Sequence, residues 1–161
     1  MKIICLGDSF TEGYMVDKSY ADYLADMGHE VKNYGVNGNR TRQMLHRFNG
    51  EDADVLIVFG GSNDTFDATS SEDIFENIKS ILKKSKASKD IVVIPPLMEL
   101  EEAYPMYELN NNTINALADM INSLNVEVVD ARAIKPSYFV DGLHMREDFH
   151  KRLADEIAKI L

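Results

Sequence analysis

The chain has 161 residues, of which 45% are hydrophobic and 27% are charged, as is typical of one soluble globular domain with a substantial core. Acidic residues outnumber basic ones by 27 to 17, so the formal net charge at pH 7 is −10. We therefore expect neither nucleic acid nor an anionic membrane as the main partner, because both require basic patches. The one cysteine, Cys5, excludes an internal disulfide framework and lies in an apolar run, which favours a buried thiol over a nucleophile.

The N-terminal segment MKIICLGDSF reaches polar and acidic residues too early for the apolar part of a secretory signal. No apolar stretch is long enough to span a bilayer. We therefore expect a cytoplasmic protein whose residues 1–161 form a single domain.

Apolar runs typical of strands alternate along the chain with segments of helical periodicity. The strand-like runs cover residues 3–6, 31–34, 55–59, 91–94 and 126–129. Apolar residues recur at helical spacing over 20–27, 44–48, 74–82, 114–121 and 149–160. This alternation predicts right-handed crossovers and a parallel sheet with helices on both faces, which is a three-layer α/β/α sandwich.

The polarity of the five runs predicts their order in the sheet. The first, third and fourth runs are continuously apolar, as strands buried on both faces must be, whereas the second and fifth contain Lys32, Asn33 and Glu127, which edge strands tolerate. The flavodoxin-like order 2-1-3-4-5 places both polar runs at the edges and makes strands 1 and 3 the switch point where such sheets bind ligands. Ser9 follows the first run and Asn63 the third, so we expect them to share a crevice.

Ser9 is the candidate nucleophile. It ends the segment Gly7-Asp8-Ser9 behind the first apolar run, where a glycine break followed by a serine indicates a tight turn that can project a hydroxyl from the sheet. The alternative is structural, because Ser9 and Glu12 match a capping box in which the serine would only begin a helix.

Asp141 and His144 are the candidate partners of that hydroxyl. A serine hydroxyl is a poor nucleophile until a base takes its proton, and a histidine base needs a partner that fixes its tautomer. Gly142 permits a sharp turn that would let the Asp141 carboxylate reach Nδ1 and leave Nε2 free. The alternative is a simple Asp-Gly turn beside an incidental surface histidine. The other histidines, His29, His46 and His150, are interpreted as non-catalytic.

Asn63 and Gly38 are candidate donors to developing negative charge. Asn63 would point its side-chain amide at an oxyanion, or else cap a helix. Gly38 would offer a backbone N–H that approaches a substrate closely, or else be an ordinary turn glycine. Asp8 and Asp64 flank these residues and are interpreted as hydrogen-bond anchors. No His, Cys or carboxylate cluster has metal-ligand spacing and no phosphate-binding loop is present, so we expect no metal and no cofactor.

Together, in order, these segments resemble the sequence blocks of the SGNH hydrolases, also called GDSL-type esterases or lipases. The blocks are Gly7-Asp8-Ser9, Gly38, Gly61-Ser62-Asn63-Asp64 and Asp141-x-x-His144, and the resemblance covers residues 1 to 161. It implies Ser9 as the nucleophile, His144 as the base oriented by Asp141, and an oxyanion hole formed by the N–H groups of Ser9 and Gly38 and the Asn63 side chain. The chain departs from the family pattern at positions that bear on substrate shape and helix packing: Phe10, Met145, Phe149 and His150.

The resemblance implies a serine esterase that hydrolyses a small-molecule ester through an acyl-enzyme. Short acyl groups are expected because the chain leaves no room for a lid domain. A thioesterase or a carbohydrate O-deacetylase would use the same site, and a binding module that holds a small ligand without turnover is the alternative from another class.

Two further groups of residues bear on the substrate. Arg40 and Arg42 follow Gly38 and would either meet an anionic substrate or remain solvated. Segment 95–112 is long for a strand–helix connection, and its apolar and aromatic residues would either line the pocket or begin a helix: Met98, Leu100, Tyr104, Met106 and Tyr107.

Overall fold

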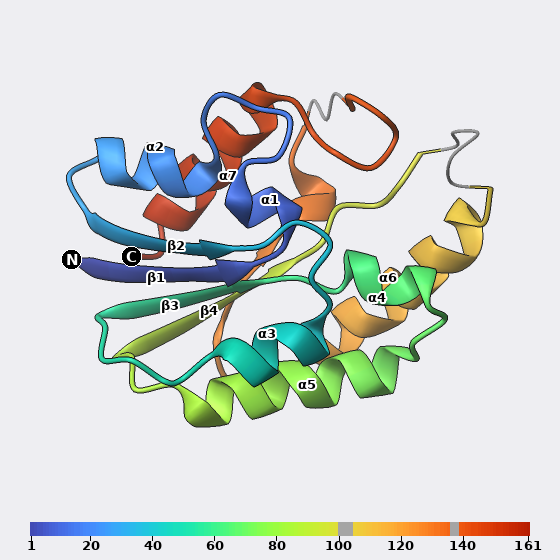
Figure 1. Cartoon of the computed structure of the whole chain (residues 1–161), viewed down its shortest axis with the longest axis horizontal. Helices are drawn as coiled ribbons and strands as arrows, with labels where there is room; N and C mark the ends of the chain where they lie inside the picture. Colours follow the sequence, from blue (N-terminus) through green and yellow to red (C-terminus); the bar gives the residue numbers. More distant parts are fainter. Residues whose placement is uncertain (100–104, 136–138) are drawn as a thin grey trace.

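The computed structural model describes residues 1–99, 105–135 and 139–161. Its centre is a five-stranded parallel sheet with the order β2-β1-β3-β4-β5, so the predicted order is confirmed (Figure 1). The strands are β1 (Lys2–Gly7), β2 (Glu30–Gly35), β3 (Val55–Phe59), β4 (Lys89–Ile94) and β5 (Glu127–Asp130). The two runs that contain polar residues form the edges, as expected.

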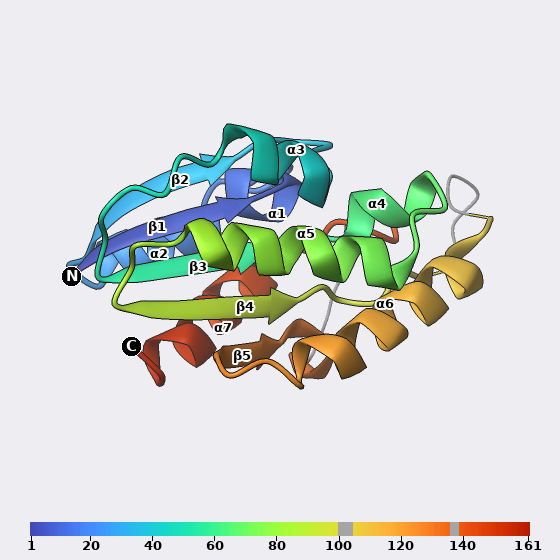
Figure 2. The same cartoon turned by 90° about the horizontal axis from the view of Figure 1, so that it is seen from below.

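Helices cover both faces of the sheet, which confirms the three-layer architecture (Figures 1 and 2). One face carries α1 (Ser9–Glu12), α2 (Tyr20–Asp26) and α7 (Glu147–Ala158). The other carries α3 (Thr41–Arg47), α5 (Ser71–Lys84) and α6 (Tyr107–Ile121). Two short pieces follow strand ends, namely α4 (Ser62–Phe66) after β3 and a 3₁₀ turn (Ala131–Ala133) after β5.

The continuous apolar runs arise because successive side chains of a strand point to opposite faces and both faces are covered. In β1, Ile3 and Cys5 pack toward α2 and α7, whereas Ile4 and Leu6 pack toward α3 and α5. All four are fully buried. Burial raises the pKa of the Cys5 thiol to about 12, which agrees with its interpretation as a small apolar residue.

The structure excludes two alternatives in which Ser9 and Asn63 would only cap helices. Ser9 is not the N-cap of α1, because Asp8 is the cap and its carboxylate accepts a hydrogen bond of 3.1 Å from the Phe10 N–H. Asn63 is not an N-cap either, since Gly61 precedes α4 in that role with a φ of 119°. Both polar side chains are therefore free of the capping role and available for other contacts.

Among residues 1–99, 105–135 and 139–161, no helix has the combination of length and apolar composition that crossing a membrane requires.

Candidate active site

Segments far apart in the sequence meet beyond the carboxyl ends of β1 and β3 (Figure 1). Ser9 Oγ lies 3.0 Å from His144 Nε2, and Nδ1 of the same ring lies 2.7 Å from Asp141 Oδ2. Ser9 and His144 are only 3% and 9% exposed. With Nδ1–H donating to the carboxylate, Nε2 is left to accept the serine hydroxyl proton. The expected partners are therefore in contact in the folded chain.

A tight turn sets the geometry of Asp141 and His144. Gly142 has a φ of 81°, a left-handed conformation that favours glycine. Asp141 Oδ1 accepts the backbone N–H groups of Leu143 at 3.1 Å and His144 at 2.7 Å, so the carboxylate is fixed by its own turn. Oδ2 is thereby aimed at the imidazole.

The loop that carries this turn is held from two sides. The Val140 N–H donates to the His144 carbonyl at 2.7 Å and closes the loop on itself. The Glu99 N–H, from the segment after β4, donates to the Gly142 carbonyl at 2.8 Å. His144 is thus positioned by main-chain bonds.

The charge of Asp141 follows from its hydrogen bonds. Burial by itself would raise the pKa of this carboxyl, but the bonds from the His144 ring and from the backbone N–H groups of His144 and Leu143 outweigh it. The pKa of Asp141 therefore lies below its ordinary value, and the group is a carboxylate at neutral pH.

The side chain of Asn63 reaches the segment that carries Ser9. Its Nδ2 donates to Asp8 Oδ2 at 3.3 Å and to the Asn39 carbonyl at 3.1 Å. Asp8 is the residue directly before Ser9 and is fully buried. The structure thus brings Ser9 and Asn63 to the same place.

Gly38 lies in the turn that Asn63 contacts. The turn is closed by a 3.0 Å bond from the Asn39 N–H to the Val36 carbonyl, and Gly38 is its third residue with a φ of 74°. A Cβ built at Gly38 would meet no neighbouring atom within 4 Å, so crowding does not explain the glycine. The reason for glycine at this position is its positive φ. Arg47 fixes the turn, because its guanidinium donates to Asn39 Oδ1 and to the Gly7 carbonyl, each at 2.8 Å.

Asp64 anchors the start of α3 and so supports the same turn. Its carboxylate accepts the Thr41 hydroxyl at 2.6 Å and the Thr41 N–H at 3.0 Å. Asn77 donates to that hydroxyl oxygen at 3.0 Å. Burial raises the pKa of Asp64 although the bonds from Thr41 act in the opposite direction.

Asp8 is the second buried carboxyl of the site. Burial raises its pKa from 3.8 to about 7, against the hydrogen bond from the Phe10 N–H. The negative charge of Asp64 contributes to this rise, and the positive charge of Arg47 acts against it.

Tyr14 borders the site and is a residue that sequence reasoning missed. Its ring centroid lies 5.0 Å from that of His144, and its backbone N–H donates to the Ser9 carbonyl at 3.0 Å. Gly13, with a φ of 90°, ends α1 and turns the chain toward the imidazole. An aromatic residue directly after a helix-ending glycine, about one turn beyond Ser9, is the signal that would have found it. Phe10, which departs from the family pattern, packs under the same imidazole at 5.9 Å.

The residues expected to line a pocket divide into three groups. Met98 is buried and accepts a bond from Asn110, while Tyr107 packs against the core. Leu100 and Tyr104 lie outside the described residues. Met106 lines a hollow of about 190 Å³ between α4 and α6, together with Phe66 and Leu109.

Of the two arginines that follow Gly38, Arg40 is committed to an ion pair with Asp67, whereas Arg42 is exposed.

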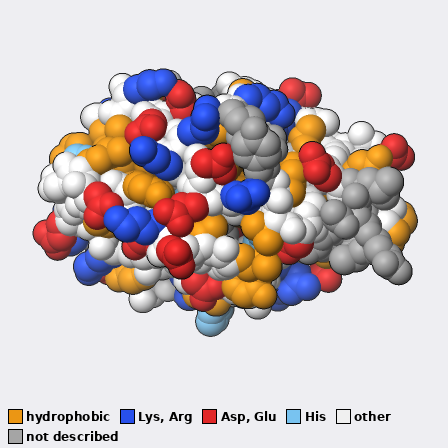
Figure 3. All heavy atoms as spheres, turned by 90° about the horizontal axis from the view of Figure 1, so that it is seen from above, with side chains coloured by type: hydrophobic (Ala, Val, Ile, Leu, Met, Phe, Trp, Pro, Cys, Tyr) orange, Lys and Arg blue, Asp and Glu red, His pale blue; other side chains and the backbone are white. Residues whose placement is uncertain are grey.

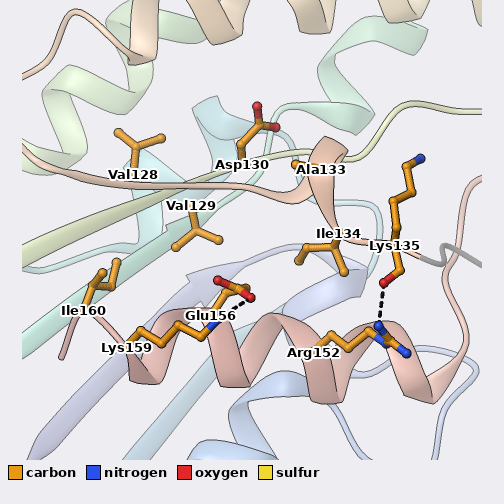
Figure 4. Close-up of a pocket in the computed structure, with 10 residues that line it drawn as sticks. All are labelled: Val128, Val129, Asp130, Ala133, Ile134, Lys135, Arg152, Glu156, Lys159 and Ile160. Carbon is orange, nitrogen blue, oxygen red and sulfur yellow. Dashed lines mark hydrogen bonds and ion pairs between the residues drawn. The ribbon is translucent and has the colours of Figure 1, made fainter.

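A wider groove of about 540 Å³ lies elsewhere, between β5 and α7 (Figure 4). Glu156 pairs with Lys159 there, and Arg152 donates to the Lys135 carbonyl. None of the residues that line this groove is a serine, cysteine or histidine. Ser9 and His144 meet at the sheet end and not in this groove.

Within the described residues, no group of three or more His, Cys, Asp or Glu side chains is arranged to hold a metal ion.

A comparison with family models decides the family. Residues 5–152 match the model of the GDSL-like lipase/acylhydrolase family. The chain belongs to this family. It is therefore a carboxylic ester hydrolase, as the resemblance implied. None of the curated protein sequences matches the chain.

Solved structures agree on the fold. The inhibitor-bound aryl esterase of M. smegmatis has 20% sequence identity and a TM-score of 0.79, with 99% of each chain covered. A carbohydrate acetylesterase family member from Sinorhizobium meliloti has 15% identity and a TM-score of 0.79, covering 99% of this chain and 96% of the other. The lipase/acylhydrolase of Enterococcus faecalis has 24% identity and a TM-score of 0.75, covering 99% and 94%.

Proposed function

We propose that this chain is a serine esterase that hydrolyses carboxylic esters of short acyl groups through an acyl-enzyme. The observation that carries the proposal is the continuous chain of hydrogen bonds from Ser9 Oγ through the His144 imidazole to Asp141, with links of 3.0 and 2.7 Å. Both distances lie in the range over which a base removes a proton from a nucleophile.

The first half-reaction uses these groups in sequence. Ser9 Oγ attacks the ester carbonyl while its proton passes to His144 Nε2. Asp141 accepts the bond from Nδ1–H and stabilises the imidazolium that forms, which suits a carboxyl whose pKa is below its ordinary value. His144 then donates the proton to the oxygen of the leaving alcohol, and the acyl group remains on Ser9.

The second half-reaction repeats the proton transfers with water. His144 takes a proton from water, the resulting hydroxide attacks the acyl carbonyl, and the proton returns to Ser9 Oγ as the carboxylic acid leaves. In both halves the oxyanion would be held by the N–H groups of Ser9 and Gly38 and by the Asn63 side chain. This assignment is supported by the turn at Gly38, which lies against Asn63 through the Asn39 carbonyl.

The hollow beside α4 supports a small substrate. This hollow has a volume of about 190 Å³, below the range of common drug-sized ligand pockets. Phe66 at its rim lies one helical turn from Asn63 on the same face of α4. On the face formed by α2 and α7, basic side chains are interspersed with acidic ones (Figure 3), which, with the net charge of −10, does not favour a nucleic acid partner.

Removal of acetyl groups from sugars is the second candidate. The acetyl group is the smallest common acyl group, and the Sinorhizobium meliloti relative is described as a carbohydrate acetylesterase family member. A panel of aryl esters, acetylated sugars and acyl-thioesters with matched acyl lengths would rank the alternatives by kcat/KM.

The central test labels the nucleophile. A sulfonyl fluoride should add one covalent group to the wild-type chain by intact-mass measurement, and Ser9→Ala should abolish both the label and nearly all hydrolysis of a short-chain aryl ester. Ser123→Ala is the matched control, because Ser123 is exposed and bonded only to its own helix end. Full activity of folded Ser9→Ala would refute the proposal.

A further inference from the structure

We propose that the Asp8 carboxylate competes with the oxyanion for an N–H of Asn63, so that Asp8 acts as a positioning residue whose neutral form is the more active one. The inference rests on the proposed function, because it concerns the donor that this function assigns to Asn63. It goes beyond that function by linking the donor to the protonation of a buried group.

The inference begins with a count of donors. A primary carboxamide has only two N–H groups. In the folded chain Asn63 Nδ2 has two acceptors, Asp8 Oδ2 at 3.3 Å and the Asn39 carbonyl at 3.1 Å. An oxyanion can therefore receive a full hydrogen bond from Asn63 only if one of these acceptors gives way.

Asp8 is the acceptor that can give way. The Asn39 carbonyl belongs to a turn that is fixed by its own 3.0 Å bond to Val36 and by Arg47, which holds the Asn39 side chain. The bond to Asp8 is the longer of the two. Its strength depends on protonation, because a carboxylate is a much stronger acceptor than a carboxylic acid.

Ionisation of Asp8 also opposes the oxyanion directly. The residue directly precedes Ser9 and is fully buried, so water screens its charge poorly. A negative charge there repels the negative charge that develops on the substrate oxygen. Both effects have the same sign, and each makes the ionised form less active.

The groups around Asp8 keep its ionisation costly. Asp64 on α4 repels a second negative charge, and Arg47 on α3 only partly offsets it, since its guanidinium is committed to Asn39 and the Gly7 carbonyl. Tyr20 on α2 stays neutral, because burial raises its pKa well above the ordinary value. Two further titratable groups lie at the site, namely His144 on the loop before α7, which is bonded to Ser9, and Tyr14 after α1, whose ring packs against that of His144.

The pKa of Asp8, raised to about 7 by burial, places this ionisation within the working range of pH. As pH rises through this value Asp8 loses its proton, holds the Asn63 amide more strongly and repels the oxyanion. The kcat should therefore fall on the alkaline side by about tenfold, less than the effect of removing a whole oxyanion donor.

The test compares kcat against pH, with a short-chain aryl ester, for the wild type, Asp8→Asn and Asp90→Asn. The amide introduced by Asp8→Asn keeps a neutral acceptor, and asparagine is itself a good helix N-cap, so α1 is retained. Asp90 is the matched control, because burial also raises its pKa while it lies in β4 and bonds to Ser85, away from the site. We expect the alkaline fall in the wild type and Asp90→Asn, and its absence in Asp8→Asn.

Two results would overturn the inference: the same alkaline fall in Asp8→Asn, or a folded Asp8→Asn that is inactive at every pH.

Should Asp8→Asn fail to fold, the side-chain amide signal of Asn63 in the wild type is followed by ¹H–¹⁵N NMR against pH. It should shift with the midpoint of the kcat fall, while the amide of Asn111, which donates to the Met98 carbonyl, should not. A constant Asn63 signal contradicts the inference. Sulfonyl fluoride labelling of the same wild-type sample separates failure of this inference from failure of the esterase itself.

Discussion

Two aspartates lie on opposite sides of the candidate site, and their pKa values are shifted in opposite directions. Asp8, in the buried pocket behind Ser9, has a pKa raised to about 7. Asp141, on the loop before α7, has a pKa below its ordinary value. Burial acts in the same direction on both groups, so burial alone does not decide the outcome.

The difference lies in the donors that each carboxyl receives. Asp141 accepts two backbone N–H groups and the imidazole, with distances of 2.7 to 3.1 Å. Asp8 accepts one backbone N–H at 3.1 Å and the Asn63 amide at 3.3 Å, and it faces the negative charge of Asp64. One region of the site is therefore built to keep a negative charge and the other to resist one.

The largest expected effect concerns Asp141. Asp141→Asn keeps the size of the side chain but removes the charge that stabilises the imidazolium, and it favours the wrong tautomer of His144. We expect kcat for an aryl ester to fall by about 10³- to 10⁴-fold with little change in KM.

Asp155→Asn is the matched control, since Asp155 is exposed on α7. Circular dichroism would establish that both variants fold. If folded Asp141→Asn retained more than a tenth of the wild-type kcat, the assignment of Asp141 as the partner of the base would be wrong.

The next effect concerns the donor that connects the two regions. Asn63→Ala removes the amide that contacts Asp8, and kcat should fall by about 10²- to 10³-fold if this amide binds the oxyanion. The alkaline fall of the residual activity should be smaller than in the wild type, because ionised Asp8 can then only repel the oxyanion and no longer holds the Asn63 amide. The measurement is kcat at several pH values. An unchanged kcat would remove Asn63 from the oxyanion hole.

The sheet could be predicted because its pattern depends on burial alone. The run Val55–Phe59 coincides with β3, since an interior strand is apolar on both faces and its limits are marked by a change in polarity. The edge strands are recognisable from Lys32, Asn33 and Glu127, because an edge strand is partly exposed and tolerates polar side chains.

Details within the site could not be read from sequence, because they depend on tertiary contacts. Asp8 and Ser9 are both good N-cap residues, and only the folded structure shows Asp8 in that role while Ser9 turns toward His144. The place of Tyr14 depends on the left-handed conformation of Gly13, which sets the direction of the chain after α1. Neither the donor count at Asn63 nor the neighbourhood of Asp8 and Asp64 is visible before the chain is folded.

The last effect, and the one that compares the two aspartates most directly, is on stability. Between pH 3.8 and about 7 the folded chain holds a proton on Asp8 that the unfolded chain has released. The stability contributed by Asp8 is thus complete below the lower value and is lost as pH rises through the upper one. The stability contributed by Asp141 depends on pH in the opposite direction, because its lowered pKa gives stability that is present above the ordinary value and is lost as pH falls.

From about pH 4 to pH 8, Asp8→Asn should therefore gain roughly 4 kcal/mol in the free energy of unfolding relative to the wild type. The deficit of Asp141→Asn should shrink toward acid pH. Urea unfolding at a series of pH values measures both differences. Curves for Asp8→Asn and the wild type that ran parallel over this range would show that the buried pocket does not resist charge, and the contrast between the two regions would be lost.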